Sequence, residues 1–156
     1  MAHFADLTPC DYFTPQHDGK LLAVGWLARM RRYSRAEVSA DVITRLHELL
    51  VSPWQPGAFL GWHDCPFCRI STGPQRITLD NVAVDLGVNN LFIPTSDVVY
   101  VAPSLILHYI DAHEYSPPQP FCDAVLACPE MRSMDYLKMI RNSAPPALFT
   151  GNEAVM

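Results

Sequence analysis

Apolar residues recur at helical spacing along one long segment of the chain. After Ser34-x-x-Glu37, a spacing typical of a helix N-terminal capping box, apolar side chains follow every three or four positions from Val38 to Leu50. Pro53 then lacks the N–H that a continuing helix needs. The pattern therefore predicts an amphipathic helix that starts at the Ser34 box and ends before Pro53.

Shorter apolar runs have the length of β-strands. Residues 21–27 predict one strand. Residues 91–93 and 98–102 predict an antiparallel hairpin, because the turn residues 94–97 separate them. A short strand is expected at 59–62, and a weak strand is expected at 77–84 within the otherwise irregular segment 69–88.

Three more helices are expected after the hairpin, at 103–113 with Pro103 in the first turn, at 121–127 and at 133–141. The pattern thus predicts an α+β fold, with a short antiparallel sheet or hairpin and about four short helices. We expect residues 1–143 to form a single globular domain and residues 144–156 to form a loose C-terminal tail.

Two cysteines and two histidines have the spacing of metal ligands. Cys65 and Cys68 form a Cys-x-x-Cys turn, which points two thiolates at one site and lets backbone N–H groups support them. His108 and His113 fall on the predicted helix 103–113, within the histidine spacing of zinc fingers. Because Zn²⁺ favours four such ligands, the sequence predicts that these residues bind one structural zinc ion.

The histidine spacing also constrains the helix that carries them. Five positions span about 500° of an α-helix, so the imidazole of His113 is offset from that of His108 by ~140°. The helix must end, tighten or bend near His113 if both rings are to reach one metal. The order of knuckle (residues 65–68), hairpin and helix is that of a Cys2His2 finger, but 39 residues (69 to 107) separate Cys68 from His108. The metal would fasten a helix to the knuckle across a long loop.

His63 is an alternative fourth ligand, because it lies two residues before Cys65. If His63 binds, His113 is free and the helix need not end there. Asp64 and Asp111 are candidates for orienting the imidazoles. A redox-active Cys-x-x-Cys pair is the competing interpretation, but it would need a βαβ context that the pattern does not predict.

The composition narrows the classes of function. The 156 residues are 49% hydrophobic, enough for one core, and the formal net charge of −5 disfavours binding to nucleic acid. The one basic cluster, Arg29 to Arg35, is interpreted as a solvated loop. No apolar stretch reaches the ~20 residues of a membrane span and no signal peptide is visible. With an odd number of cysteines, five, we expect reduced thiols and a cytoplasmic protein.

Several short motifs together resemble a known group of proteins. They are Asp6-Leu7-Thr8-Pro9 with Tyr12, Val24-Gly25-Trp26-Leu27, Gly61-Trp62-His63-x-Cys65-x-x-Cys68, Asn90-Leu91-Phe92-Ile93-Pro94, Tyr100-Val101-Ala102-Pro103, His108-Tyr109-Ile110-x-x-His113 and Ala124-Val125-x-x-Cys128-Pro129. Across most of residues 4–140 the chain resembles an uncharacterised bacterial family of small proteins, a domain of unknown function. The resemblance implies that these motifs belong to one domain, and it brings no activity, substrate or partner.

Three functions are compatible with these features. A zinc-stabilised, non-catalytic interaction or regulatory module with another protein as partner is favoured, with Tyr12, Trp26, Trp54 and Trp62 as candidate surface anchors or core residues. A zinc hydrolase would need an open coordination position and a base such as Asp64 or Glu114. Nucleic-acid binding through the finger-like helix ranks last, since that helix is apolar and acidic. The oligomeric state is left open.

Overall fold

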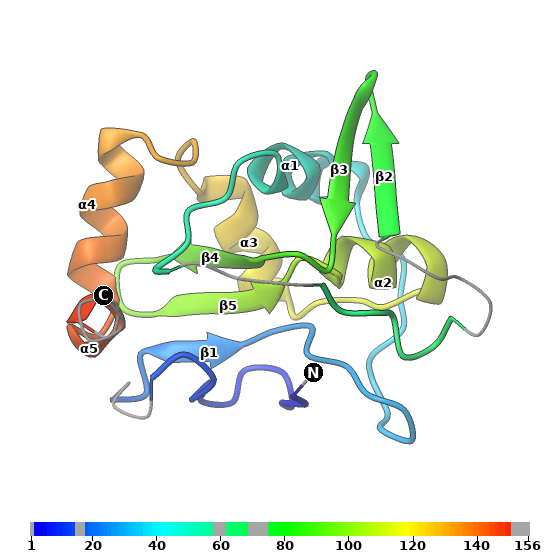
Figure 1. Cartoon of the computed structure of the whole chain (residues 1–156), viewed down its shortest axis with the longest axis horizontal. Helices are drawn as coiled ribbons and strands as arrows, with labels where there is room; N and C mark the ends of the chain where they lie inside the picture. The colour runs from blue at the N-terminus through cyan, green and yellow to red at the C-terminus, as the bar shows by residue number, and fades with distance from the viewer. Residues whose placement is uncertain (1, 15–17, 58–61, 69–74, 151–156) are drawn as a thin grey trace.

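The computed structural model describes residues 2–14, 18–57, 62–68 and 75–150 of the chain (Figure 1). It confirms an α+β fold with two small sheets. In chain order the elements are β1 (Leu21–Ala23), α1 (Ala40–Leu50), β2 (Gln75–Leu79), β3 (Val82–Leu86), β4 (Asn90–Pro94), β5 (Val99–Pro103), α2 (Ile106–His113), α3 (Gln119–Ala127), α4 (Met134–Ser143) and α5 (Ala147–Thr150). None of the helices in the described part of the chain is long and apolar enough to cross a membrane.

The central sheet has the strand order β1-β5-β4. The predicted β4–β5 hairpin is confirmed as an antiparallel pair, and every residue of both strands is buried. Strand β1 joins the other edge of β5 in parallel. It is shorter than predicted because Gly25 turns the chain with φ +78°, and a Cβ there would lie 2.9 Å from a side-chain carbon of Ile106. Only glycine fits this close approach, which packs the β1 edge against α2.

The second sheet is the hairpin β2–β3, which stands apart from the central sheet in Figure 1. Our expectation of one weak strand at 77–84 is wrong. Asp80 and Asn81 both have positive φ, 48° and 65°, so they form a tight two-residue turn between two strands. Position 62 of the short strand expected at 59–62 is not in a strand, and residues 59–61 lie outside the described part of the chain.

Helix α1 begins later than the capping box predicts. Ser39 is the N-cap, and its hydroxyl accepts a hydrogen bond from the Val42 N–H at 3.4 Å. The expected box at Ser34 and Glu37 is wrong because that segment is extended and pairs with the chain after α2. The Ser34 carbonyl accepts from the Ser116 N–H at 2.9 Å, and Arg35 forms a bridge with Tyr115. The helix does end before Pro53, as predicted.

The helices after the central sheet lie close to their expected positions. Pro103 is the last residue of β5 rather than part of α2, α3 begins two residues earlier than predicted, and α4 has Ser133 as its N-cap. Residues 144–150 differ from the expected loose tail. Ala144 and Leu148 are buried, and α5 covers Ala147–Thr150. The remaining tail residues, 151–156, lie outside the described part.

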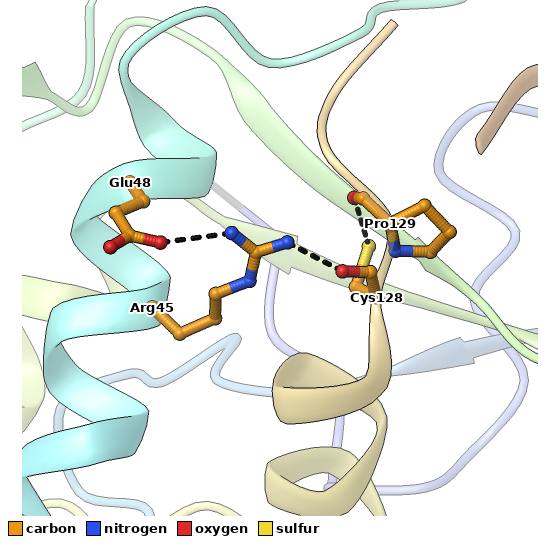
Figure 2. Close-up of polar contacts among 4 residues, drawn as sticks. All are labelled: Arg45, Glu48, Cys128 and Pro129. Carbon is orange, nitrogen blue, oxygen red and sulfur yellow. Dashed lines mark hydrogen bonds and ion pairs between the residues drawn. The ribbon is translucent and has the colours of Figure 1, made fainter. Parts of the chain in front are cut away.

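Arg45 joins α1 to the end of α3 (Figure 2). Its Nη2 donates to the carbonyl of Cys128, the C-cap residue of α3, at 2.5 Å, and its Nη1 lies 2.9 Å from Glu48 Oε2. A cation at the C-terminal end of a helix complements the partial negative charge of the last carbonyls. On the other side of α1, His47 is buried, and its Nε2 donates to the Val82 carbonyl of the β2–β3 hairpin at 3.0 Å. Helix α1 is thus fixed both to α3 and to the second sheet.

Candidate metal centre

The knuckle is held in place by its own backbone and by the chain that leads into it. The His63 N–H donates to the Gly87 carbonyl at 2.8 Å, directly after β3. Gly87 has φ +87°, and a Cβ at this position would lie 2.5 Å from the His63 carbonyl oxygen. Only glycine permits this contact. Within the knuckle, the Phe67 N–H donates to Cys65 Sγ at 3.4 Å, which is the backbone support expected of a Cys-x-x-Cys turn.

The two histidines come from α2, which ends where the spacing requires. His113 is the last residue of the helix, and Glu114 follows in the left-handed conformation, with φ 59°. The backbone turns away at that point, and the two imidazole rings approach to 5.1 Å between centroids. The helix thus ends at the left-handed Glu114, three residues before Pro117.

The structure brings together the four predicted ligands, Cys65, Cys68, His108 and His113, which we call the Cys2His2 cluster. Their ligand atoms all lie within 4.8 Å of one another. Cys65 Sγ is 3.3 Å from His113 Nε2, and Cys68 Sγ is 3.3 Å from His108 Nε2 and 3.5 Å from His113 Nε2. Both histidines therefore point the same nitrogen at the thiols, and the cluster could hold a metal ion.

The size of the cluster fits a tetrahedral zinc ion. Zn–S bonds of about 2.3 Å and Zn–N bonds of about 2.05 Å, at the tetrahedral angle, separate sulfur from nitrogen by about 3.6 Å. The three sulfur–nitrogen distances of 3.3 to 3.5 Å are close to that value. A single ion therefore needs only a slight expansion of the cluster.

A buried hydroxyl near the thiols of the cluster is left without a hydrogen-bond partner in the described part of the chain. This hydroxyl belongs to Tyr109, which is fully buried. Burial raises the pKa of Tyr109, and the nearby thiols of Cys65 and Cys68 raise it further. Thiolates bound to a metal would be acceptors for this unpaired donor.

Burial sets the protonation state of the cluster before any metal binds. It lowers the pKa of His108 below the usual 6.5, and the neighbouring His113 lowers it further, while Asp111 acts in the opposite direction. Burial and the charge of Arg35 also lower the pKa of His113. Burial raises the pKa of Cys65 to about 11. At neutral pH the imidazoles are therefore in the neutral, metal-binding form, whereas the thiol of Cys65 must lose a proton to become a ligand.

His63, the alternative ligand, lies outside the group of mutually close ligand atoms. Its backbone, paired with Gly87, is what positions the knuckle. Asp64 and Asp111 are both exposed, and Asp111 affects His108 through its charge. Neither carboxylate forms a hydrogen bond to a cluster histidine among the described contacts.

An aromatic layer covers the cluster, and our sequence analysis did not assign it. The ring of Phe67, within the knuckle, lies 5.2 Å from the His113 ring, 5.9 Å from the Tyr109 ring and 5.6 Å from the Tyr33 ring. Tyr33 also donates its hydroxyl to the His113 carbonyl at 3.0 Å. In the sequence, the position of Phe67 between the two cysteines could have indicated that an aromatic ring lies beside the cluster. The part played by Tyr33 depends on how the loop before α1 folds back.

Together the fold and the cluster define an α+β protein with a Cys2His2-like metal-binding group. The chain belongs to an uncharacterised family described as a domain of unknown function (DUF7919), whose sequence profile matches residues 2–126. The family resemblance expected from the motifs is thereby confirmed. The matched range contains the whole cluster and ends within α3. No curated protein and no solved structure matches the chain.

Proposed function

We propose that the Cys2His2 cluster binds a structural Zn²⁺ and that the protein is a non-catalytic interaction or regulatory module. The observation that carries this proposal is the mutual approach of four ligand atoms to within 4.8 Å, with sulfur–nitrogen distances close to those around tetrahedral zinc. Two thiolates and two imidazoles in this geometry favour zinc among common metals. Four protein ligands leave no position for the water that a zinc hydrolase activates.

The proposed partner is another protein, and the proposed location is the cytoplasm of a bacterial cell. Trp26 is buried and Trp54 is partly buried in the core, but Tyr12 and Trp62 expose 41% and 46% of their surface and are available to a partner. All five cysteines are free thiols, as a reducing compartment allows. Burial raises the pKa values of Cys10 and Cys128 to about 11, which keeps these thiols unreactive.

The metal and its coordination can be tested on the purified protein. We expect elemental analysis to give one zinc per chain and X-ray absorption at the zinc edge to show two sulfur and two nitrogen ligands. A shell that includes a water oxygen and only three protein ligands would contradict the structural role and favour the hydrolase.

The Cys65→Ser variant tests whether the metal supports the fold. We expect it to lose zinc and to unfold at a lower temperature than the wild type, because the hydroxyl of serine is a poor zinc ligand. Cys10→Ser is the matched control, since Cys10 is a buried thiol outside the cluster. It should keep its zinc. A Cys65→Ser protein with unchanged thermal stability would contradict the proposed role.

A further inference from the structure

One loop of this acidic chain carries a dense cluster of positive charge. Four of its 11 lysines and arginines lie within residues 29–35, although the net charge is −5. In the structure this segment precedes α1, and its turn is made by Met30, which has φ 65° and a fully exposed side chain. The loop therefore places an apolar side chain in solvent directly among four guanidinium groups.

The loop forms one wall of a cavity of about 550 Å³. Its lining is Met30, Arg31, Arg32, Tyr33, Arg35 and Phe67. The cavity is thus cationic and partly aromatic, with an apolar methionine at its rim. Arginine, aromatic residues and methionine are the side chains enriched at protein interfaces.

Three contacts attach this loop to the metal centre. Arg29 Nε donates to the carbonyl of Pro66, within the knuckle, at 2.6 Å. The Tyr33 hydroxyl donates to the carbonyl of His113, and the Tyr33 ring packs on Phe67. The cavity therefore lies between the arginine loop and the knuckle, and a metal in the cluster would hold both of its walls in place.

Two of the arginines are available to a ligand. Arg35 lies 3.6 Å from Glu114 and 4.8 Å from the Tyr33 ring centre, so its charge is partly compensated. Arg31 and Arg32 are exposed, and neither has an ion pair with any residue in the described part of the chain. These two guanidinium groups lie beside the aromatic lining residues Tyr33 and Phe67, and each can bind a carboxylate through paired hydrogen bonds.

We propose that this cavity is the docking site for an acidic segment of a partner protein that carries an apolar side chain. The inference rests on the proposed function, because it names the partner of the zinc-stabilised module. The neighbouring cavity shares Arg35, but its other charged lining residues are Glu37, Asp111 and Glu114. A long polyanion that left the arginine loop in that direction would therefore meet three carboxylates against one guanidinium group. A short acidic peptide avoids this repulsion, and its apolar side chain fits against Met30 and Phe67.

Binding can be measured by fluorescence anisotropy with a labelled heptapeptide of glutamates around one central leucine. The glutamine version of the peptide is the charge control. We expect the acidic peptide to bind the zinc-loaded protein, the glutamine peptide to bind at least tenfold more weakly, and the Arg31→Ala/Arg32→Ala variant to lose at least tenfold in affinity. Rising salt should weaken the binding, because the contacts are ionic.

The matched control variant is Lys138→Ala/Arg141→Ala. It removes the same number of positive charges from exposed positions on α4, at the opposite end of the molecule from α2 (Figure 1). We expect its affinity for the peptide to change by less than twofold. An equal loss in both double variants would overturn the proposal, since it would show attraction by overall charge rather than a docking site.

Competition identifies the class of ligand, and zinc analysis separates the two proposals. If inorganic phosphate or an oligothymidylate displaces the peptide more effectively than unlabelled peptide does, the acidic-peptide assignment is wrong. Every sample is also analysed for zinc. A wild-type protein that holds zinc but does not bind the peptide contradicts this inference alone, whereas a wild-type protein without zinc contradicts the proposed function.

Discussion

His113 is the last residue of α2, and the left-handed Glu114 directly after it lets the His113 ring turn toward the thiols. We therefore expect His113→Ala to lower zinc affinity by more than about 100-fold, a larger loss than that caused by removing a group outside the ligand shell. His63→Ala, which removes the alternative ligand, should change the affinity by less than about tenfold. Competition with a chromophoric chelator measures both constants. The reverse order would assign the fourth ligand to His63.

Tyr109 gives a second prediction about a single residue. A buried hydroxyl without a partner costs about 1–3 kcal/mol, so Tyr109→Phe should not destabilise the metal-free protein. If the hydroxyl donates to a thiolate when zinc is bound, the same variant should lose roughly 10–100-fold in zinc affinity.

Tyr136→Phe is the control for Tyr109→Phe. The Tyr136 hydroxyl is also buried, but it already donates to the Phe92 carbonyl at 2.7 Å. This variant should unfold at a lower temperature and keep its zinc affinity. A Tyr109→Phe protein with unchanged zinc affinity would show that the hydroxyl is not a donor to the cluster.

The four residues of the Cys2His2 cluster could be predicted from the sequence to lie together, whereas their surroundings could not. Cys65 and Cys68 are close in the chain, and a helix fixes the relation between His108 and His113, so local spacing was sufficient. Tyr109 lies between the two histidines, but the sequence analysis names it only as part of the motif His108-Tyr109-Ile110-x-x-His113. Its proximity to the thiols depends on how α2 packs against the knuckle, and a one-dimensional pattern does not contain that information.

At the scale of elements, Arg45 provides the contact whose contribution can be isolated. Its side chain is 22% exposed, and it donates to the carbonyl of the α3 C-cap residue Cys128. Arg45→Met keeps the aliphatic stem but loses a charged hydrogen bond, so we expect a loss of about 1.5–3 kcal/mol in the free energy of unfolding.

Glu48→Gln is the matched control for Arg45→Met. It removes the negative charge of the other partner of Arg45 in Figure 2, whose side chain is 56% exposed, and should cost less than about 1 kcal/mol. Urea denaturation measures both variants. Equal losses would mean that the ion pair along α1, rather than the contact with α3, carries the stabilisation.

Elements were predicted well where one local signal acted alone. The hairpin β4–β5 has apolar strands around a clear turn, and α1 ends before Pro53 as proline chemistry requires. The prediction failed where tertiary pairing competed with a local signal, since Ser34 pairs with Ser116 and the helix takes Ser39 as its cap. The β2–β3 hairpin was not predicted because its turn, Asp80-Asn81, depends on two residues with positive φ and lacks the glycine that marks such turns in a sequence.

For the whole molecule, the metal should contribute to stability in proportion to its binding. With free zinc at about 1000 times the dissociation constant, the stabilisation is about 4 kcal/mol, and in a protein of this size removing it by chelation should lower Tm by roughly 10 °C. Differential scanning calorimetry with and without chelator measures this shift. The shift should disappear in Cys65→Ser, and a shift of the same size in that variant would point to metal bound elsewhere.

Zinc affinity should also depend on pH, and the pKa values of the cluster residues determine whether it rises or falls. Burial holds the pKa of Cys65 near 11 before metal binds, whereas the pKa values of His108 and His113 lie below 6.5. At pH 7 the Cys65 thiol is therefore protonated and must release its proton on binding, so we expect at least one proton per zinc ion. Affinity should fall as pH falls, more steeply once the histidines also take up protons. Calorimetry in buffers of different ionisation enthalpy counts the protons, and zinc binding without proton release would contradict this account.

The parallel pairing of β1 with β5 has a consequence for the newly made chain. Leu21 lies opposite Val99, so 78 positions separate the two partners. At about 5–20 residues per second, a ribosome needs roughly 4–16 s to make the intervening chain, and β1 has no partner strand during that time. The thiols of Cys65 and Cys68 likewise lack the histidines of α2 until that helix has been synthesised. We therefore expect productive folding to begin only after synthesis has passed α2, with nascent chains exposed to chaperones until then.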